Sequence, residues 1–370
     1  MKADKLAALL REERFFGVSL ASSLVFLGFG KSLVDSLSNP LWLTGISIWL
    51  FLAILGSVFC VVRHADHLAV RLGEPYGTLI LTIAVTAIEV ISISATMLHG
   101  SNNPTLARDT LFAVVMIVLN GMVGLSLLVG GWRHREQHYN FQSANTYLSV
   151  IIPLAVLSLV LPNFTQTTPG PILSSSQETF LAIMAIGLYA AFLAIQTSRH
   201  RAYFRFDEEK AQHDPLAGTA RPLMAHSALL IAYMVPVAYL AEQLGSPIDQ
   251  MENVMHAPAA LGGLLIAALV ATPEAISAVR AAAANQVQRS VNISLGSVLA
   301  TIGLTVPSML VVSHLTGKKI VLGVQHTDLI LLPLTLVVSV VTFASGRTNI
   351  LQGTVHLLLF AAYVMLVFEN

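Results

Sequence analysis

Long apolar stretches separated by short polar ones run along nearly the whole chain. A helix rises about 1.5 Å per residue, so about 20 apolar residues are enough to cross roughly 30 Å of hydrocarbon. The pattern therefore predicts an all-α integral membrane protein with about 11 transmembrane helices. The expected spans are 17–36, 42–62, 77–98, 107–130, 146–161, 179–197, 223–243, 257–280, 291–314, 328–345 and 350–368.

Basic residues in the polar stretches predict the side of the membrane on which each stretch lies. Lysine and arginine gather in alternate stretches, which the positive-inside rule assigns to the cytoplasm together with the N-terminus. Lys318 and Lys319 are the exception, because they fall in a stretch assigned to the outside. The first apolar run lacks a signal-cleavage pattern, so we expect a multi-pass protein of the bacterial inner membrane.

Composition agrees with this class and excludes others. The chain has 370 residues, of which 55% are hydrophobic and 11% charged, whereas an ordinary soluble domain has about 25% charged residues. The formal net charge is zero and no basic patch is mixed with aromatic residues, so we expect no nucleic-acid partner. A single cysteine, Cys60, excludes an internal disulfide and a cysteine-based metal cluster. Nothing in the sequence predicts the oligomeric state.

Two segments of the chain resemble each other. The segment from Gly77 to Ser92 aligns without gaps on the segment from Gly262 to Ser277. Five expected spans separate the two starts, and an odd number reverses the direction of the chain across the membrane. The sequence therefore predicts one leading helix and two inverted five-helix repeats. The expected divisions are an interfacial helix at 1–16, the leading helix at 17–36, the repeats at 42–197 and 223–370, and a cytoplasmic linker at 198–222.

The linker is the longest polar interruption in the chain. It begins with basic residues and continues with an acidic group at 207–209. Two interpretations stay open: a solvated connection between the repeats, or an acidic segment that senses cations or covers a gate.

The repeat places one glutamate in each half, Glu89 and Glu274. Each lies 12 residues past the first glycine of its segment, about 18 Å along a helix, so both are expected near the middle of the bilayer. A charged group at that depth costs a few kcal/mol and usually marks an ion path. The alternative is that the glutamates only hydrogen-bond between helices. Oxygen groups expected to join them are Thr82, Thr86, Ser92, Asn120, Thr272, Ser277, Ser297 and Thr301.

These residue types favour a hard cation as the ligand. Ca²⁺ prefers several oxygen ligands that include carboxylates, and Pro273 is expected to break the helix and expose carbonyl oxygens beside Glu274. A buried carboxyl binds either a proton or a cation, so the two ions compete for Glu89 and Glu274. Competition at a site that opens alternately to each side is antiport. The expected partners are cations (Ca²⁺, or Na⁺ or K⁺), protons and the lipid bilayer, with no resident cofactor.

Two other functions remain as rivals. A cation channel would use the same carboxylates in a continuous pore. An intramembrane enzyme is disfavoured, because the sequence contains neither an HExxH metal motif nor an aspartate-rich diphosphate motif. The sequence contains no ATP-binding loop, so it does not indicate an ATP-driven pump.

A polar group on the cytoplasmic side contains two histidines three residues apart. Histidine titrates near neutral pH, so a pH-sensing or gating role is one interpretation, and a salt-bridged turn at the membrane surface is the other. A zinc site is also conceivable, although the spacing alone is weak evidence. The candidates for pH sensing or gating are His64, Asp66, His67, Glu74 and His256, the last of which is expected to open the second repeat helix from outside.

The repeat and its surroundings resemble the cation/Ca²⁺ exchanger superfamily, and within it the bacterial Ca²⁺/H⁺ (Na⁺/H⁺, K⁺/H⁺) antiporter family. The resemblance extends from Val61 to the end of the chain. It implies that Glu89 and Glu274 coordinate the transported cation and take up protons. The motifs that carry it are Gly-Glu-Pro-Tyr-Gly at 73–77, Thr-Pro-Glu at 272–274, Asn-Gln-Val-Gln-Arg at 285–289 and the run from Gly296 to Pro307.

The chain departs from that family in the residues before each glutamate. Vacuolar calcium/proton exchangers typically have Gly-Asn-Ala there, whereas this chain has Val-Thr-Ala at 85–87 and Val-Ala-Thr at 270–272. Two amide side chains are therefore missing. Ca²⁺ remains the leading candidate, and monovalent cations become credible beside it.

Overall fold

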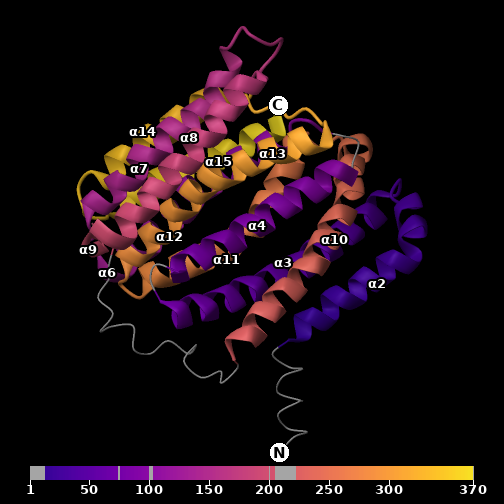
Figure 1. Cartoon of the computed structure of the whole chain (residues 1–370), viewed down its shortest axis with the longest axis horizontal. Helices are drawn as coiled ribbons and strands as arrows, with labels where there is room; N and C mark the ends of the chain where they lie inside the picture. The colour runs from indigo at the N-terminus through magenta and orange to yellow at the C-terminus, as the bar shows by residue number, and fades with distance from the viewer. Residues whose placement is uncertain (1–12, 74–75, 100–102, 200, 205–221, 370) are drawn as a thin grey trace, which may run out of the picture. The chain divides into compact units, whose positions relative to one another are not determined.

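The computed structural model describes residues 13–73, 76–99, 103–199, 201–204 and 222–369. Within these ranges the chain is helical apart from short connections and one isolated bridge between His138 and Arg347 (Figure 1). Ten described helices are long and apolar enough to cross a membrane, and an eleventh apolar helix, α14 (Asp328–Phe343), is shorter. The predicted all-α membrane fold with about 11 spans is confirmed.

The chain divides into two compact units. Unit 1 comprises Met1–Asn103 and Leu216–Ala259, and unit 2 comprises Pro104–Pro215 and Ala260–Asn370. Glu89 therefore belongs to unit 1 and Glu274 to unit 2.

Four helices build unit 1. Helix α10 packs along α3, α4 and α2, and α2 and α4 also pack on α3 (Figure 1). Asn39 starts α3 because its side chain accepts a hydrogen bond from the Leu41 amide, while Pro40 occupies a position where no amide hydrogen is needed. The helices are α2 (Arg14–Asp35), α3 (Pro40–Leu72), α4 (Tyr76–His99) and α10 (Leu223–Met255).

Helices α3 and α10 run further than their apolar stretches. Both contain 33 residues and end 10 and 12 residues beyond the expected spans of 42–62 and 223–243. Polar side chains do not stop a helix, because its backbone groups stay hydrogen-bonded to one another outside the hydrocarbon. The histidine-rich stretch around His64 is consequently part of α3, where Arg63 forms a salt bridge with Glu13 at 2.8 Å.

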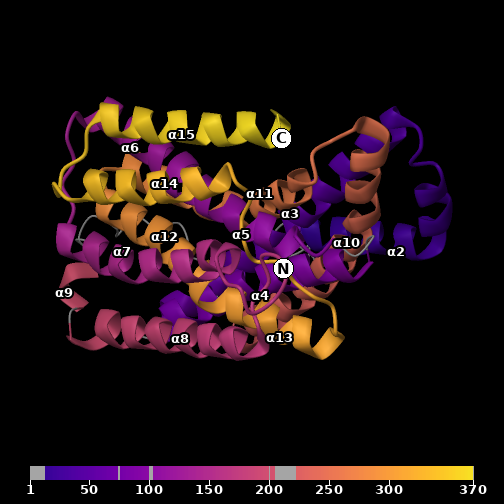
Figure 2. The ribbon, with the colours of Figure 1, turned by 90° about the horizontal axis from the view of Figure 1, so that it is seen from above.

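Unit 2 contains the remaining described helices. Helices α15, α14, α7 and α8 run side by side in that order (Figure 2), and α11 packs on α5, α6 and α12. The helices are α5 (Leu106–Met116), η1 (Ile117–Met122), α6 (Val123–His134), α7 (Phe141–Ala155), η2 (Val156–Val160), η3 (Leu161–Asn163), α8 (Ser175–Ala194), η4 (Ile195–Arg199), α9 (Arg201–Phe204), α11 (Ala260–Ala283), α12 (Val287–Ala300), η7 (Thr301–Thr305), α13 (Val306–Thr316), α14 and α15 (Ile350–Glu369).

Helix α11 approaches α5 through a glycine. A Cβ atom added to Gly263 would lie 2.6 Å from the backbone carbonyl carbon of Asp109 and 2.6 Å from the Thr110 amide nitrogen. Small residues at helix contacts allow backbones in a membrane to pack closely. Gly263 lies 11 residues before Glu274, so this contact fixes the helix that carries the second carboxylate.

Two of the expected divisions fall largely outside the described residues. The interfacial helix at 1–16 is one, and α2 already begins at Arg14. The linker at 198–222 is the other, since only its first residues and its last are described.

Candidate cation-binding residues in the two units

Glu89 is buried on α4 in unit 1, with 1% of its surface exposed. Thr86 and Ser92, each three residues from it, share its side of the helix and are also buried. In the described part of the chain, the hydroxyl oxygens of Thr86 and Ser92 have no hydrogen-bond partner. Several other buried hydroxyls of the described helices instead donate to the carbonyl one turn earlier, as Ser57 does to Ala53 at 2.8 Å. Two hydroxyls beside the carboxylate therefore remain available to a ligand.

The contacts of α4 show which way this face points. Thr96 lies seven residues after Glu89, on the same face, and its hydroxyl donates to the Ala241 carbonyl of α10 at 3.0 Å. Thr82, seven residues before Glu89, is half-buried. Near the C-terminal end of α4, the face that carries Glu89 is thus directed toward α10.

Glu274 lies on α11 in unit 2 and is half-buried. The Ser297 hydroxyl, from α12, donates a hydrogen bond to Glu274 Oε2. The two residues were both predicted for the site, and the structure brings them together across two helices. A carboxylate paired with a hydroxyl offers oxygens of the kind that hard cations prefer.

Helix α11 continues without a break through Pro273, so the expected interruption of the helix is absent. The neighbouring hydroxyls bond to their own helix: Thr272 Oγ1 donates to the Ala268 carbonyl at 2.5 Å, and Ser277 Oγ donates to the Pro273 carbonyl at 3.0 Å. These two residues remain predicted ligands, although ligation would require their hydroxyls to change hydrogen-bond partners.

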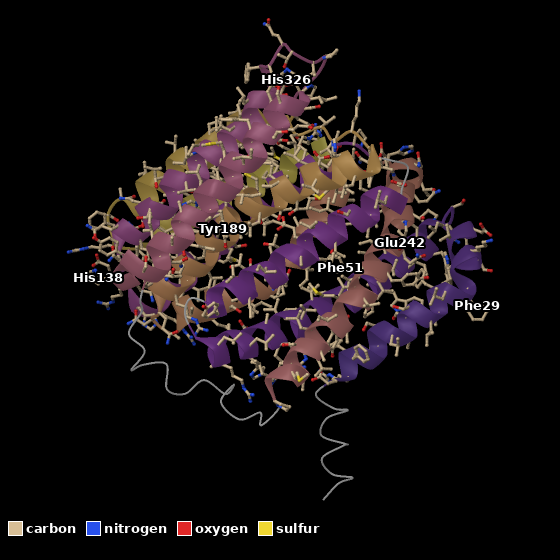
Figure 3. The ribbon with its side chains drawn as sticks, viewed as in Figure 1. Phe29, Phe51, His138, Tyr189, Glu242 and His326 are labelled. Carbon is tan, nitrogen blue, oxygen red and sulfur yellow. The ribbon has the colours of Figure 1, made fainter. Side chains whose placement is uncertain are left out.

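Two π-helical segments occupy similar places in unit 2. The helix that follows each glutamate helix changes from α to π and back, at η1 after α5 and at η7 after α12. Asn120 lies in η1 and Thr301 begins η7, and both are buried. Tyr189 of α8 packs against Gly303 in η7 (Figure 3). Such π segments frequently mark functional sites, because they rotate side chains out of the regular helical positions.

Asn120 belongs to a buried hydrogen-bond chain that sequence reasoning missed. Its amide nitrogen donates to Thr335 Oγ1 at 2.8 Å, and its Oδ1 lies 3.1 Å from His356 Nδ1. His356 Nε2 lies 3.0 Å from Thr342 Oγ1. An amide oxygen only accepts, so His356 carries its proton on Nδ1. Asn120 is therefore held in one orientation from α14 and α15, and its role as a ligand remains a prediction.

Tyr139, between α6 and α7, extends this series of hydrogen bonds beyond Thr342. Its hydroxyl donates to the Thr342 carbonyl at 3.0 Å. Burial raises the pKa of Tyr139 to about 12, because desolvation disfavours the phenolate. The hydroxyl therefore keeps its proton and its donor role throughout the physiological pH range.

The residues predicted for pH sensing or gating separate into different places. His64, Asp66 and His67 lie on α3 in unit 1, and Glu74 lies outside the described residues. His256 is exposed and ends α10 in a left-handed conformation, four residues before α11 begins. The expectation that His256 opens the second repeat helix is therefore wrong.

A multi-span helical protein that buries a carboxylate beside unpaired hydroxyls belongs to the class of membrane ion transporters. Comparison with known sequences specifies the family. The family described as sodium/calcium exchanger protein matches residues 42–198 and 226–369. The chain belongs to this family.

Three similar proteins illustrate the range of the family. A Sinorhizobium fredii protein named as an ionic transporter is 43% identical over 84% of this chain and 85% of its own length. The sodium-potassium/proton antiporter ChaA of Escherichia coli is 40% identical over 87% of this chain and 88% of its own length. The solved structure of YfkE, named a Ca²⁺/H⁺ antiporter, has a TM-score of 0.74 at 20% identity and covers 96% of this chain and 100% of its own. At that identity the likeness to YfkE shows the fold alone.

Proposed function

We propose that the protein is a secondary antiporter that exports a cytoplasmic cation in exchange for external protons by alternating access. Glu89 and Glu274 bind both ions in this proposal. The observation that carries it is the placement of one buried carboxylate with two available hydroxyls in unit 1, and of one carboxylate bonded to Ser297 in unit 2. Membership in the exchanger family supports it.

The chemistry follows from competition for the carboxylates. A carboxylate that holds a proton no longer neutralises a cation, so cation binding releases protons and proton binding releases the cation. Ca²⁺ carries two positive charges and exchanges for two protons, whereas Na⁺ or K⁺ exchanges for one. The number of protons exchanged therefore depends on the charge of the transported cation. The exchange needs no resident cofactor.

The name of the E. coli relative supports a monovalent cargo, and the carboxylate-rich site supports Ca²⁺. The missing amides before Glu89 and Glu274 weaken the argument for Ca²⁺. Ca²⁺, Na⁺ and K⁺ are therefore all candidates for the transported cation, and transport assays decide between them.

The proposed location is the inner membrane of a bacterium, with the N-terminus in the cytoplasm. Arg63 and Arg71, at the end of α3, and Arg133, at the end of α6, lie in stretches that the positive-inside rule places inside. The bacterial origin of the relatives supports this location.

The test uses purified protein in vesicles with a pH jump, to which Ca²⁺, Na⁺ and K⁺ are added in turn. We expect saturable cation movement that reverses when the pH gradient is reversed. A cation channel, the rival function, would conduct without a pH gradient and would not drive cations against their own gradient. We expect Glu89→Gln and Glu274→Gln each to abolish the exchange, and full activity in either variant would contradict its assignment.

A further inference from the structure

A cluster of histidines lies in unit 1, apart from the transport carboxylate. His64 of α3 and His226 of α10 are both 1% exposed, and their Nδ1 atoms lie 3.0 Å apart. The ring of His67 stacks on that of His226, with centroids 4.7 Å apart and planes inclined by 31°. We call His64, His67 and His226 the histidine cluster. The cluster connects α3 to α10 through the contact between His64 Nδ1 and His226 Nδ1.

Glu13, just before α2, places a negative charge against this cluster. Its Oε2 accepts hydrogen bonds from Arg63 Nη2 and from the Tyr233 hydroxyl, each at 2.8 Å. The same oxygen lies 3.4 Å from His64 Nε2. One carboxylate oxygen thus contacts side chains of both α3 and α10.

These contacts determine where the protons of the two imidazoles lie. The Glu13 carboxylate lies 3.4 Å from His64 Nε2, too long for a hydrogen bond, but its negative charge favours a proton on this nitrogen. In neutral His64 the Nδ1 atom then carries no hydrogen and acts as a hydrogen-bond acceptor. The Nδ1–Nδ1 contact needs one donor and one acceptor, so His226 donates from its Nδ1. The neutral pair is held by an N–H···N bond in one defined arrangement.

One added proton strengthens this arrangement. It binds to Nε2 of His226, which leaves the Nδ1–H donor in place and makes it part of a cation. A hydrogen bond from a charged donor is roughly twice as strong as a neutral one. A proton on His64 Nδ1 instead would set two N–H groups against each other. The pair therefore accepts a single proton without rearrangement, and that proton fastens α3 to α10.

The positive charge of a protonated pair would be affected by the charged and titratable groups around His64 and His226. The part of α4 before Glu89, which also packs on α3 and α10, has no charged side chain. His67, the third imidazole of the cluster, faces His226 from α3. Other charged or titratable side chains near the cluster come from three segments. They are Glu13 and Arg14 at the start of α2, Cys60, Arg63 and Asp66 of α3, and Tyr233 of α10. The carboxylate of Glu13 is the anion in direct contact with the pair.

We propose that His64, His226 and Glu13 form a regulatory proton-binding site, distinct from Glu89 and Glu274, that slows exchange when the cytoplasm becomes acidic. The direction of this control rests on the proposed function. An antiporter that imports protons acidifies the cytoplasm, and α10 packs directly on α4, which carries Glu89. A proton that fastens α10 to α3 restrains the helix against which the transport helix lies. The site therefore limits proton entry.

The test compares pH profiles of exchange in vesicles at saturating cation, with the external pH held constant. Burial lowers the pKa of His64, because desolvation disfavours the charged imidazole, while the Glu13 carboxylate raises it. We expect wild-type flux to fall by about half or more when the cytoplasmic-side pH changes from 8 to 5, because the protonated fraction of the pair grows over this range. His64→Gln and His226→Gln keep an amide donor but no titratable group, so their flux should stay nearly constant over this range.

The matched control is His326→Gln, because His326 is exposed in the loop before α14 of unit 2 (Figure 3). It should keep the wild-type profile. If His64→Gln and His226→Gln also follow the wild-type profile, the regulatory site is refuted.

A second measurement does not depend on transport. Nitrogen NMR of the full-length protein with labelled histidine should show coupling between two Nδ1 atoms, which His226→Gln removes. If no such coupling exists at any pH between 6 and 8, the site is refuted. A wild type that exchanges no cation for protons refutes the proposed function, while this coupling still decides whether His64 and His226 share a proton.

Discussion

The buried chain around His356 allows a quantitative prediction. His356→Leu removes the contact of Nδ1 with Asn120 and that of Nε2 with Thr342, which are 3.1 and 3.0 Å long. All three side chains are at most 3% exposed, so water cannot replace the lost partners. In water-soluble proteins each buried group left unsatisfied costs about 1–3 kcal/mol.

The membrane reduces this magnitude. In membrane proteins, hydrogen bonds between helices contribute about 0.6 kcal/mol on average and at most about 1.7, because the unfolded state also finds partners there. Two lost bonds therefore predict a loss of about 1–3 kcal/mol in the free energy of unfolding. The membrane value applies here because Asn120 and His356 both lie within helices that are expected to span the bilayer.

The assay is a double-mutant cycle on unfolding in mixed micelles, with His356→Leu, Asn120→Leu and the double variant. We expect a coupling energy of about 0.6–1.7 kcal/mol between the two residues. Thr354→Val on the same helix is the control, since Thr354 is exposed and bonds only to the Ile350 carbonyl among the contacts described for it. Coupling below about 0.3 kcal/mol would refute the argument that His356 holds Asn120 in place.

Two further predictions concern unit 2. Ser297→Ala removes the hydroxyl that bonds to Glu274, so the KM for the cation should rise by about tenfold, the effect of about 1.4 kcal/mol. Ser294→Ala removes only a bond to the Ser290 carbonyl and should leave the KM unchanged; equal KM values for the two variants would contradict the assignment. Gly263→Val should lower the yield of folded protein, measured by size-exclusion chromatography, because its Cβ would lie 2.6 Å from the backbone of α5. A Cβ atom added to Gly187 meets no atom within 4 Å, so Gly187→Val should fold normally; similar yields for the two variants would show that the close approach is not required.

The sequence predicted the membrane spans well, for a simple physical reason. The hydrophobic length needed to cross a bilayer is set by lipid, so each span is visible without knowledge of its neighbours. The ends of α3 and α10 were missed, because a helix extends beyond the hydrocarbon wherever its backbone bonds permit. Hydropathy detects the membrane boundary and not the end of the helix.

The sequence indicated the two carboxylates of the candidate site and only some of the groups around them. Glu89 and Glu274 stand out because ionisable groups are rare in apolar stretches and because the repeat duplicates them. The pairing of Ser297 with Glu274 followed from the same repeat. The orientation of Thr272 and Ser277 did not, since a hydroxyl on a helix bonds equally well to its own backbone.

Contacts between distant segments were beyond the sequence. His64 and His226 are separated by 162 residues, and helical periodicity does not show which faces of two helices meet. His226 and His356 each look like an ordinary packing histidine until the structure shows their partners. The π segments η1 and η7 were equally invisible in the sequence.

The central claim is that cation and proton compete for Glu89 and Glu274. The most direct measurement is the KM for the cation as a function of pH, with equal pH on both sides of the vesicles and a cation gradient as the driving force. Competition predicts that KM rises as the pH falls, and that Glu89→Gln and Glu274→Gln abolish exchange. A KM that is independent of pH would show that the proton binds elsewhere and would contradict this account.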